Sequence, residues 1–489
     1  MASMLWPTRW FKKGAGIAPS GKVPIFLTNT LSGDKEVFIS HTRGTALLYS
    51  CGPTVYGPAH IGNLRSYVFS DTLTRVLKCG GYRVLRVINI TDVGHLVGDG
   101  DEGEDKMAVG AEREKTSPEA IAKKYAELFI EDLEQLNIDT SDIRFPRATE
   151  YINEQIVLAR TLEEKGFAYR LKHGLAFDTA RFPGYGRLGN VDVAAQRAGA
   201  RVDADKEKRH PADFWLWRSA RPHDLQQWNS PWGRGNPGWH IECSAMIRAL
   251  LGPEIDIHTG GEDHIAIHNN NEIAQSEAAL GRPFVRYWMH NAFLTMDGEK
   301  AAKSLGNVVY LSDIMEHGYH PLALRYFFLQ AHYRSPISFT WEALAAASAG
   351  LERLWALSRA VADESARARE ASQSRTAFLA AMRDDLGTPQ ALAILWETLR
   401  SEEYSPEEKW GLIEDAEAHL GLKLTEPPAS NTVAGADIPE DIARLLAKRA
   451  TARDAKDFAE ADRLRDELET RGYHVEDGPA GPVLTKRTL

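Results

Sequence analysis

Four side chains of this sequence could together bind one metal ion, although they lie far apart in the chain: Cys51, Cys243, His268 and Glu272. His268 and Glu272 are four residues apart, which on a helix places both side chains on one face. Thiolate, imidazole and carboxylate are all groups that zinc accepts as ligands. A plainer interpretation is that the cysteines are small buried apolar residues and the His-x-x-x-Glu pair is a surface contact. Spacing alone leaves both interpretations open, because widely separated ligands form no local motif.

A possible anion site lies in the stretch Leu47–Ser66, LLYSCGPTVYGPAHIGNLRS. Its apolar run, its Gly/Pro break and its helical pattern after His60 predict a buried parallel strand whose loop leads into a helix N-terminus. Such an end offers unpaired N–H groups and a partial positive charge, which favour phosphate. His60 and Asn63 would then bind a phosphate or, as the alternative, simply cap the helix.

Two further groups of residues are compatible with nucleotide binding. Gly260 and Gly261 precede Asp263, so the backbone could approach a nucleotide while the carboxylate binds its ribose; a plain turn is the alternative. Lys300 and Lys303 flank two alanines in a glycine-containing stretch. They are either solvated charges or cations that close on the anion site.

Length and composition limit the class of protein. A chain of 489 residues is too long for one hydrophobic core and predicts several domains. The formal charge of −10 argues against a generally basic nucleic-acid binder but allows a local basic surface. The three cysteines cannot form a disulfide framework, no apolar run reaches the roughly 18 residues of a membrane span, and the N-terminus lacks a signal-peptide pattern. We therefore expect a cytoplasmic protein.

The elements that must position these residues begin with a strand–helix–strand unit. Helical spacing over Ser66–Leu77 and a strand-like run at Tyr82–Ile90 predict the start of a Rossmann-type parallel α/β sheet. From Gly94 the sequence becomes polar and mostly helical, and strand–loop–helix punctuation returns at Pro237–Met246. The amphipathic pattern from Ala343 to Leu420 predicts a helical bundle, and a charged helix opens a small terminal module.

Over nearly its full length the sequence resembles the cysteinyl-tRNA synthetases, which are class I aminoacyl-tRNA synthetases. The order and separation of the matching segments are far more specific than any one of them. They are CGPTVYGPAHIGN (Cys51–Asn63), INITDVGH (Ile88–His95), GWHIECSAM (Gly238–Met246), IHTGGEDH with HNNNEIAQSEA (Ile257–Ala278), DGEKAAKSLGN (Asp297–Asn307) and RATARDAKDFAEADRLRDEL (Arg449–Leu468).

The resemblance implies ATP-dependent ligation of L-cysteine to cysteine tRNA through a cysteinyl-adenylate. It places His60 and Asn63 where the family's H-I-G-H signature binds ATP phosphates, with Asn63 in place of the second His. It places Lys300, Lys303 and Ser304 in the mobile K-M-S-K-S loop that clamps the triphosphate. The other implied roles are ATP contacts for Gly260, Gly261 and Asp263, an amino-acid pocket lined by Thr91 and Trp239, and one zinc ion per chain on Cys51, Cys243, His268 and Glu272, with ATP entering as its Mg²⁺ complex.

The fold class expected on this basis is α/β, a Rossmann-type parallel-sheet catalytic domain with an insertion, followed by an α-helical bundle and a small C-terminal module. The expected boundaries are an N-terminal extension at 1–22, the first half of the catalytic domain at 23–93, an inserted connective domain at 94–231, the second half at 232–312, a stem-contact region at 313–345, the helical bundle at 346–425, a linker at 426–438 and an anticodon-recognition module at 439–489.

A zinc ion would make physical sense for a substrate that must be told from serine. Apolar pockets distinguish near-isosteres by only about 1–3 kcal/mol. Zinc binds a thiolate through a bond that serine makes poorly, so no separate editing domain is needed. We see no segment that requires one.

Three departures from the family pattern bear on activity. The usual His-His-Glu-Asn-Glu reads His268-Asn269-Asn270-Asn271-Glu272, so both implied ligands remain in a more neutral neighbourhood. Ala301-Ala302 replace Met-Ser or Ile-Ser between the lysines, which predicts slower activation. The ending GPAGPVLTKRTL lacks an expected aromatic residue, which predicts weaker anticodon affinity.

Two alternative functions follow from the same residues. A ligase that joins cysteine to the amine of a sugar–inositol shares the adenylation core but generally lacks the terminal module. A catalytically weakened synthetase paralogue would bind tRNA or metal only, and the altered lysine loop favours it. The expected partners are cysteine tRNA, L-cysteine and ATP, with no membrane, and we expect a monomer.

Overall fold

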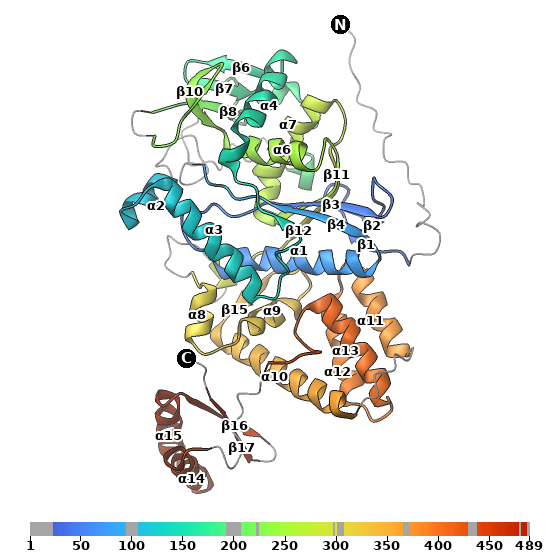
Figure 1. Cartoon of the computed structure of the whole chain (residues 1–489), viewed down its shortest axis with the longest axis vertical. Helices are drawn as coiled ribbons and strands as arrows, with labels where there is room; N and C mark the ends of the chain where they lie inside the picture. Colours follow the sequence, from blue (N-terminus) through green and yellow to red (C-terminus); the bar gives the residue numbers. More distant parts are fainter. Residues whose placement is uncertain are drawn as a thin grey trace.

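A five-stranded parallel sheet lies at the centre of the molecule (Figure 1). The computed structural model describes residues 23–93, 106–191, 207–221, 224–296, 299–300, 308–364, 372–428, 438–478 and 481–486. The strand order is β12-β11-β3-β4-β5, with all four pairings parallel. The strands are β3 (Thr45–Ser50), β4 (Arg83–Ile88), β5 (Ile143–Arg144), β11 (Ile255–Gly261) and β12 (Val285–Asn291).

The neighbouring strands β3 and β11 come from distant parts of the chain, and the strand order reverses between them. In open α/β sheets a ligand crevice forms at the carboxyl ends of the strands at such a point. The predicted strand, loop and helix of Leu47–Ser66 are observed as β3, a loop and α1 (Ile61–Cys79). The predicted Rossmann-type α/β class is confirmed.

Helices cover both faces of this sheet (Figure 1). On one face lies α1, and on the other lie α4 (Ile152–Glu164), α6 (Trp239–Leu250) and α7 (Asn270–Leu280). Successive side chains of a strand point to opposite faces, so Leu48 packs in the cluster with α1 while Tyr49 packs in the cluster with α6 and α7. A strand that is buried on both faces must be apolar throughout, which explains the run at the end of β3.

The chain between β4 and α6 builds a separate antiparallel sheet of order β6-β7-β8-β10-β9. Residues 94–231, predicted as one insertion, also contain β5, the edge strand of the parallel sheet. The chain therefore returns to the parallel sheet before the antiparallel sheet begins, and β10 of the antiparallel sheet lies beyond the predicted boundary at 231. The elements are α2 (Lys106–Glu114), α3 (Pro118–Gln135), η1 (Ala148–Tyr151), β6 (Ala168–Leu171), β7 (Gly174–Phe177), η2 (Thr179–Arg181), η3 (Leu188–Asn190), β8 (Phe214–Ser219), β9 (Trp228–Ser230) and β10 (Gly233–Pro237).

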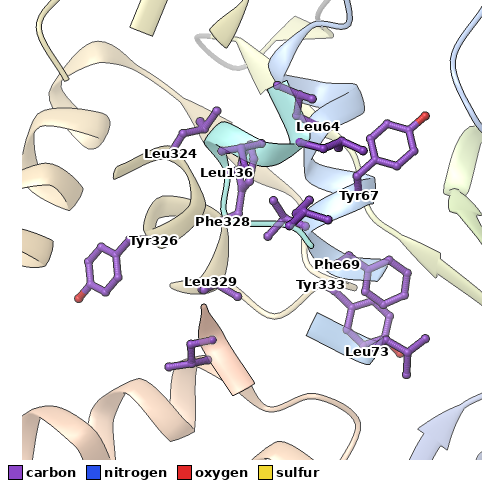
Figure 2. Packing of buried hydrophobic residues seen from close by; sticks show 14 of the residues in the cluster. Leu64, Tyr67, Phe69, Leu73, Leu136, Leu324, Tyr326, Phe328, Leu329 and Tyr333 are labelled. Atoms are coloured by element: carbon purple, nitrogen blue, oxygen red, sulfur yellow. The ribbon is translucent and has the colours of Figure 1, made fainter. Parts of the chain in front are cut away.

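Below the sheet, α1 is sandwiched between its strands and a group of helices that follows the second half of the sheet (Figure 1). Figure 2 shows the apolar residues of this junction, in which Phe69 of α1 stacks on Tyr333 with ring centroids 4.4 Å apart. The elements here are β13 (Leu294–Met296), β14 (Glu299–Lys300), α8 (Leu311–Glu316), α9 (Pro321–Leu329), β15 (Ile337–Phe339), α10 (Trp341–Glu364), α11 (Gln373–Arg383), α12 (Thr388–Arg400) and α13 (Pro406–Leu420). The amphipathic pattern over Ala343–Leu420 is thus observed as four helices, α10 to α13.

The terminal module is a helical hairpin followed by a β-hairpin. Its elements are α14 (Glu440–Asp454), α15 (Phe458–Thr470), β16 (Tyr473–Gly478) and β17 (Gly481–Lys486). It has a small apolar core of its own, in which Ile442 and Leu468 are almost fully buried. Within the described residues, no helix combines the length and the apolar character needed to cross a membrane.

Candidate active site and metal centre

A cavity of about 470 Å³ opens at the carboxyl ends of β3, β4 and β11. It brings together residues that the sequence places up to 243 positions apart, from Cys51 to Leu294. The predicted site residues in its lining are Cys51, His60, Asn63, Thr91, Trp239, Cys243, Gly260, Gly261, Asp263 and His268. Lys303 and Ser304 lie outside the described residues, and Lys300 is described only by its backbone, at the end of β14.

The four predicted metal ligands converge beside this cavity. Their ligand atoms all lie within 4.8 Å of one another, and all four residues are buried. Cys51 follows β3 directly and Cys243 lies in α6, whereas Glu272 lies in the first turn of α7. His268 belongs to a π-helical turn, η5 (Ile265–Asn269), that leads into α7. Such turns often mark functional sites in helices.

His268 offers a nitrogen that suits a metal ion. Its Nε2 lies 3.0 Å from an oxygen of Glu272, yet it makes no hydrogen bond of acceptable geometry with any described residue. Its Nδ1 lies 2.9 Å from Nδ1 of His240. Metal-bound histidines usually engage their second nitrogen in this way, which fixes the ring orientation. Two sulfurs, one imidazole and one carboxylate, all buried, fit zinc.

The four predicted ligands shift one another's pKa values. The hydrogen bond from Cys51 lowers the pKa of Cys243 to about 6, and the same contact raises that of Cys51. Burial opposes the ionisation of Glu272, but His258 and His268 hold the pKa of that carboxyl well below its usual range. Burial would also lower the pKa of His268, but the Glu272 carboxylate raises it to about 10. The neighbouring groups thus favour the ionised forms of Cys243 and Glu272, both of which are buried.

A layer of polar side chains that the sequence did not reveal surrounds these ligands. His258 Nε2 lies 3.1 Å from the second oxygen of Glu272, and Asn269 Nδ2 donates to the first at 3.0 Å. Asn89 accepts from the N–H of Gly52 at 2.8 Å and donates to Thr91 at 3.0 Å, so it connects the loop after Cys51 to the segment after β4. The available signal for this residue was an asparagine directly after β4, at the carboxyl end of the strand.

The three asparagines between His268 and Glu272 have individual structural roles. Asn269 orients Glu272, Asn270 donates to the carbonyl oxygens of Leu188 and Ile265, and Asn271 accepts from the Tyr185 hydroxyl at 2.6 Å. All three are buried. Of the neutral neighbours predicted from the sequence, Asn269 therefore contacts the carboxylate directly, whereas Asn270 and Asn271 hold the turn against the segment from Tyr185 to Leu188.

The N-terminus of α1 forms the opposite wall of the cavity. His60 is its N-cap: Nδ1 accepts from the N–H of Asn63, and Asn63 Oδ1 accepts from the N–H of His60, both at 3.2 Å. The capping alternative considered for this pair is thus the observed geometry. It places the helix end, with its partial positive charge, at the cavity wall beside Gly62 and Ser66.

The wall of the cavity beside the four predicted metal ligands includes Trp239, the first residue of α6. Its ring centroid lies 5.0 Å from that of His268, and it is half-buried at the cavity wall. Lys106, which the sequence did not single out, places its Nζ 5.0 Å from the same indole. Its helix α2 is held on the loop after β3, because Arg113 donates to the carbonyl oxygen of Tyr56 at 2.9 Å.

Two protein-family models match this chain, one over the catalytic part and one over the C-terminal module. The family model described as "tRNA synthetases class I (C) catalytic domain" matches residues 38–349, and the model "Cysteinyl-tRNA ligase anticodon binding domain" matches residues 435–481. Cysteine--tRNA ligase 1 of Burkholderia lata is 47% identical over 475 residues, covering 94% of this chain and 97% of that protein. The cysteine--tRNA ligase of Thermus thermophilus is 42% identical over 478 residues, covering 94% and 98%.

Solved structures with the same fold are more distant in sequence. The methionyl-tRNA synthetase of Mycobacterium tuberculosis in complex with methionyl-adenylate superposes with a TM-score of 0.52 at 16% identity, covering 78% of this chain and 90% of that one. A leucyl-tRNA synthetase from Agrobacterium radiobacter, in a ternary complex with tRNA, gives a TM-score of 0.57 at 13% identity, covering 80% and 86%. At these identities the similarity establishes the fold alone.

Proposed function

The chain belongs to the cysteine–tRNA ligases, class I aminoacyl-tRNA synthetases, and on that premise we propose that it joins L-cysteine to cysteine tRNA in two steps in the cavity between Cys51 and His60. In the first step the carboxylate of cysteine attacks the α-phosphate of ATP and pyrophosphate leaves. In the second, a hydroxyl of the terminal adenosine of the tRNA attacks the activated carbonyl and AMP leaves.

The first step needs positioning and charge neutralisation more than it needs acid–base groups. The N-terminus of α1, with His60 and Asn63, would face the phosphates, since these residues line the cavity. Lys300, Lys303 and Ser304 would complete the triphosphate clamp, and ATP would enter with Mg²⁺. Gly260 and Gly261 leave the backbone open to the nucleotide, with Asp263 exposed at the cavity wall for the ribose.

The observation that carries the substrate assignment is the buried quartet of Cys51, Cys243, His268 and Glu272, whose ligand atoms lie within 4.8 Å of one another. A zinc ion held there would supply a Lewis acid with affinity for the substrate thiolate. Thr91 and Trp239 line the same end of the cavity and would enclose the amino acid beside it.

The remaining parts of the chain are assigned to tRNA. We expect residues 313–345 to contact the acceptor stem and the module at 439–489 to recognise the anticodon, which the family match at 435–481 supports. Because the chain has a formal charge of −10, we expect its tRNA contacts to be confined to local basic patches. Binding should weaken as the salt concentration rises, because the release of counterions from the tRNA then contributes less to the binding free energy. We propose a monomer that acts in the cytoplasm.

The decisive experiment combines three measurements on one preparation: zinc content, cysteine-dependent ATP–pyrophosphate exchange, and charging of transcribed cysteine tRNA. One zinc per chain, exchange with cysteine but not serine, and charging of the tRNA are expected. Protein without zinc that activates serine as readily as cysteine would refute the proposal.

A weakened paralogue is the second candidate, because Ala301-Ala302 replace the bulky and hydroxyl side chains of the lysine loop. We predict slow but measurable adenylate formation, and faster formation in the double variant Ala301→Met, Ala302→Ser, measured by pre-steady-state quench. Equal rates in both proteins would contradict a role for these two side chains. Failure of cysteine-dependent exchange in both would favour the binding-only paralogue.

The terminal module argues against the sugar–inositol ligase, and charging of tRNA separates that reaction from the synthetase.

A further inference from the structure

One wall of the active-site cavity is a loop that contains none of the predicted site residues. The loop joins β12 to β13, and its residues Asn291–Leu294 all line the cavity. Strand β12 runs parallel to β11, with Asn291 opposite Gly261, and Asp263 follows shortly after. The loop therefore lies on the side of the cavity proposed for the nucleotide, and β12 is two strands away from β3, which leads to Cys51.

Arg65 of α1 holds this loop from outside the cavity. Its Nη1 donates to the carbonyl oxygens of Ala292 and Phe293, both at 2.7 Å, and its Nη2 donates to that of Ser335 at 2.6 Å. The side chain is only 2% exposed, and burial lowers its pKa to about 10, so it stays charged near neutral pH. Its acceptors among the described residues are all backbone carbonyl groups. One guanidinium thus fixes two distant segments to the helix that His60 caps.

Two further contacts complete the support of the loop. The N–H of Phe293 donates to Oε1 of Glu262 at 2.7 Å, and the N–H of Ala292 donates to the carbonyl oxygen of Tyr333 at 2.9 Å. The Tyr333 ring stacks in turn on Phe69 of α1 (Figure 2). Every backbone donor and acceptor of Ala292 and Phe293 is therefore engaged, and the engaging groups lie behind the loop.

We propose that Arg65 and Glu262 are positioning residues for the nucleotide step, which hold Asn291–Leu294 in place as the wall against which ATP binds. Neither side chain lines the cavity, so both act through the backbone of the loop. The inference rests on the proposed function in one respect, namely that ATP binds beside β11 and β12. A misplacement of about 1 Å in such a wall can cost about 100-fold in rate. Because other strands build the end of the cavity with the metal ligands, the effect should fall on ATP and not on cysteine.

The first test compares two buried arginines. Arg65→Lys keeps the charge but cannot span both segments, so the KM for ATP in cysteine-dependent exchange should rise about tenfold. The KM for cysteine and the zinc content should stay at the wild-type values. Arg325→Lys is the matched control, because Arg325 is also buried and also donates to two carbonyl groups, those of Leu420 and Leu136, but lies away from the cavity. It should leave the KM for ATP unchanged. A KM does not depend on the folded fraction, so a loss of stability in either variant does not disturb the comparison.

The second test uses Glu262, which is half-buried and therefore tolerant of substitution. Glu262→Ala removes the acceptor of the Phe293 N–H and should raise the KM for ATP about fivefold. Glu262→Gln keeps an oxygen that accepts the same N–H and should restore the wild-type value. The dissociation constant of ATP, measured by calorimetry, should follow the same order in all four variants without any turnover.

An unchanged KM for ATP in Arg65→Lys, an equal rise in the KM for cysteine, or an equal rise in Arg325→Lys would overturn the inference. A wild-type chain that binds ATP, with the expected order among the variants, but shows no cysteine-dependent exchange would contradict the proposed function and support the positioning role. A wild-type chain that does not bind ATP would overturn both.

Discussion

Two buried carboxylates, Glu272 and Asp71, lie in helices on opposite faces of the parallel sheet and have opposite kinds of partner. Glu272 is surrounded by groups that can lose a proton, namely His258, His268 and the Cys51 thiol. Asp71 is surrounded by Arg325 at 2.6 Å, Arg75 at 2.7 Å and Arg86 at 3.7 Å, which stay charged at any ordinary pH.

This difference separates a functional site from a structural one. Histidine and cysteine can exchange their protons for a metal ion, so the Glu272 cluster can be completed by zinc. Arginine stays protonated and cannot bind a metal ion, so the Asp71 cluster has a structural role: it connects helices that are distant in the sequence. Arg325 of α9 also donates to the carbonyl oxygens of Leu420 and Leu136, which links α9 and the ends of α13 and α3 to the carboxylate of α1.

The largest effect is expected from Asp71→Asn. Removing the charge leaves buried guanidinium groups without their shared partner, which costs about 3–5 kcal/mol of unfolding free energy. Equilibrium urea unfolding measures this loss. Asp142→Asn, which removes only the exposed ion pair with Lys78, is the matched control and should cost less than about 1 kcal/mol. Similar losses in the two variants would contradict the structural role of the Asp71 cluster.

Glu272→Gln should affect function rather than the connection between domains. Loss of a charged ligand is expected to lower cysteine-dependent exchange about 100-fold and to leave zinc below one equivalent per chain. Metal analysis and exchange assays on the same sample check both results. Ser276→Ala, on the same helix, should retain full zinc; a Gln variant that also retained full zinc would remove Glu272 from the ligand set.

The pH dependence of stability should distinguish the two clusters further. Burial opposes ionisation of Asp71, but Arg325 and Arg75 hold its pKa at about 2, below the ordinary 3.8. Because the pKa in the folded state is the lower one, the stabilisation is complete above about pH 5 and is lost as pH falls toward 2, by about 2 kcal/mol. The difference in unfolding free energy between wild type and Asp71→Asn should shrink by that amount over this range. A constant difference would mean that Asp71 is not held ionised by the arginines.

The smallest effect is expected from Asn269→Ala. This change removes the amide that donates to Glu272 while all four ligands stay, so zinc affinity should fall about tenfold. Competition with a chelator measures the affinity. Asn271→Ala is the control, since that amide bonds Tyr185 instead, and it should leave zinc affinity unchanged. Equal losses would show that packing of the turn, and not the contact with the carboxylate, decides metal affinity.

The sequence by itself determined the local elements and, through its ordered motifs, the family. The apolar run, break and helical spacing of Leu47–Ser66 correspond to β3 and α1, because such periodicity reports directly which backbone segments are buried and on which face. The same motifs named the four residues that the fold brings within 4.8 Å of one another. Lys303 and Ser304 stay predictions, since they lie outside the described residues.

Only the tertiary structure decided which partners these residues have. His258 beside Glu272, Asn89 beside Cys243, and Asp71 paired with Arg325 at a separation of 254 residues leave no local pattern in the chain. Hydrophobic periodicity shows which side of an element is buried. The partner of a buried charged group depends instead on which distant elements pack around it and exclude water.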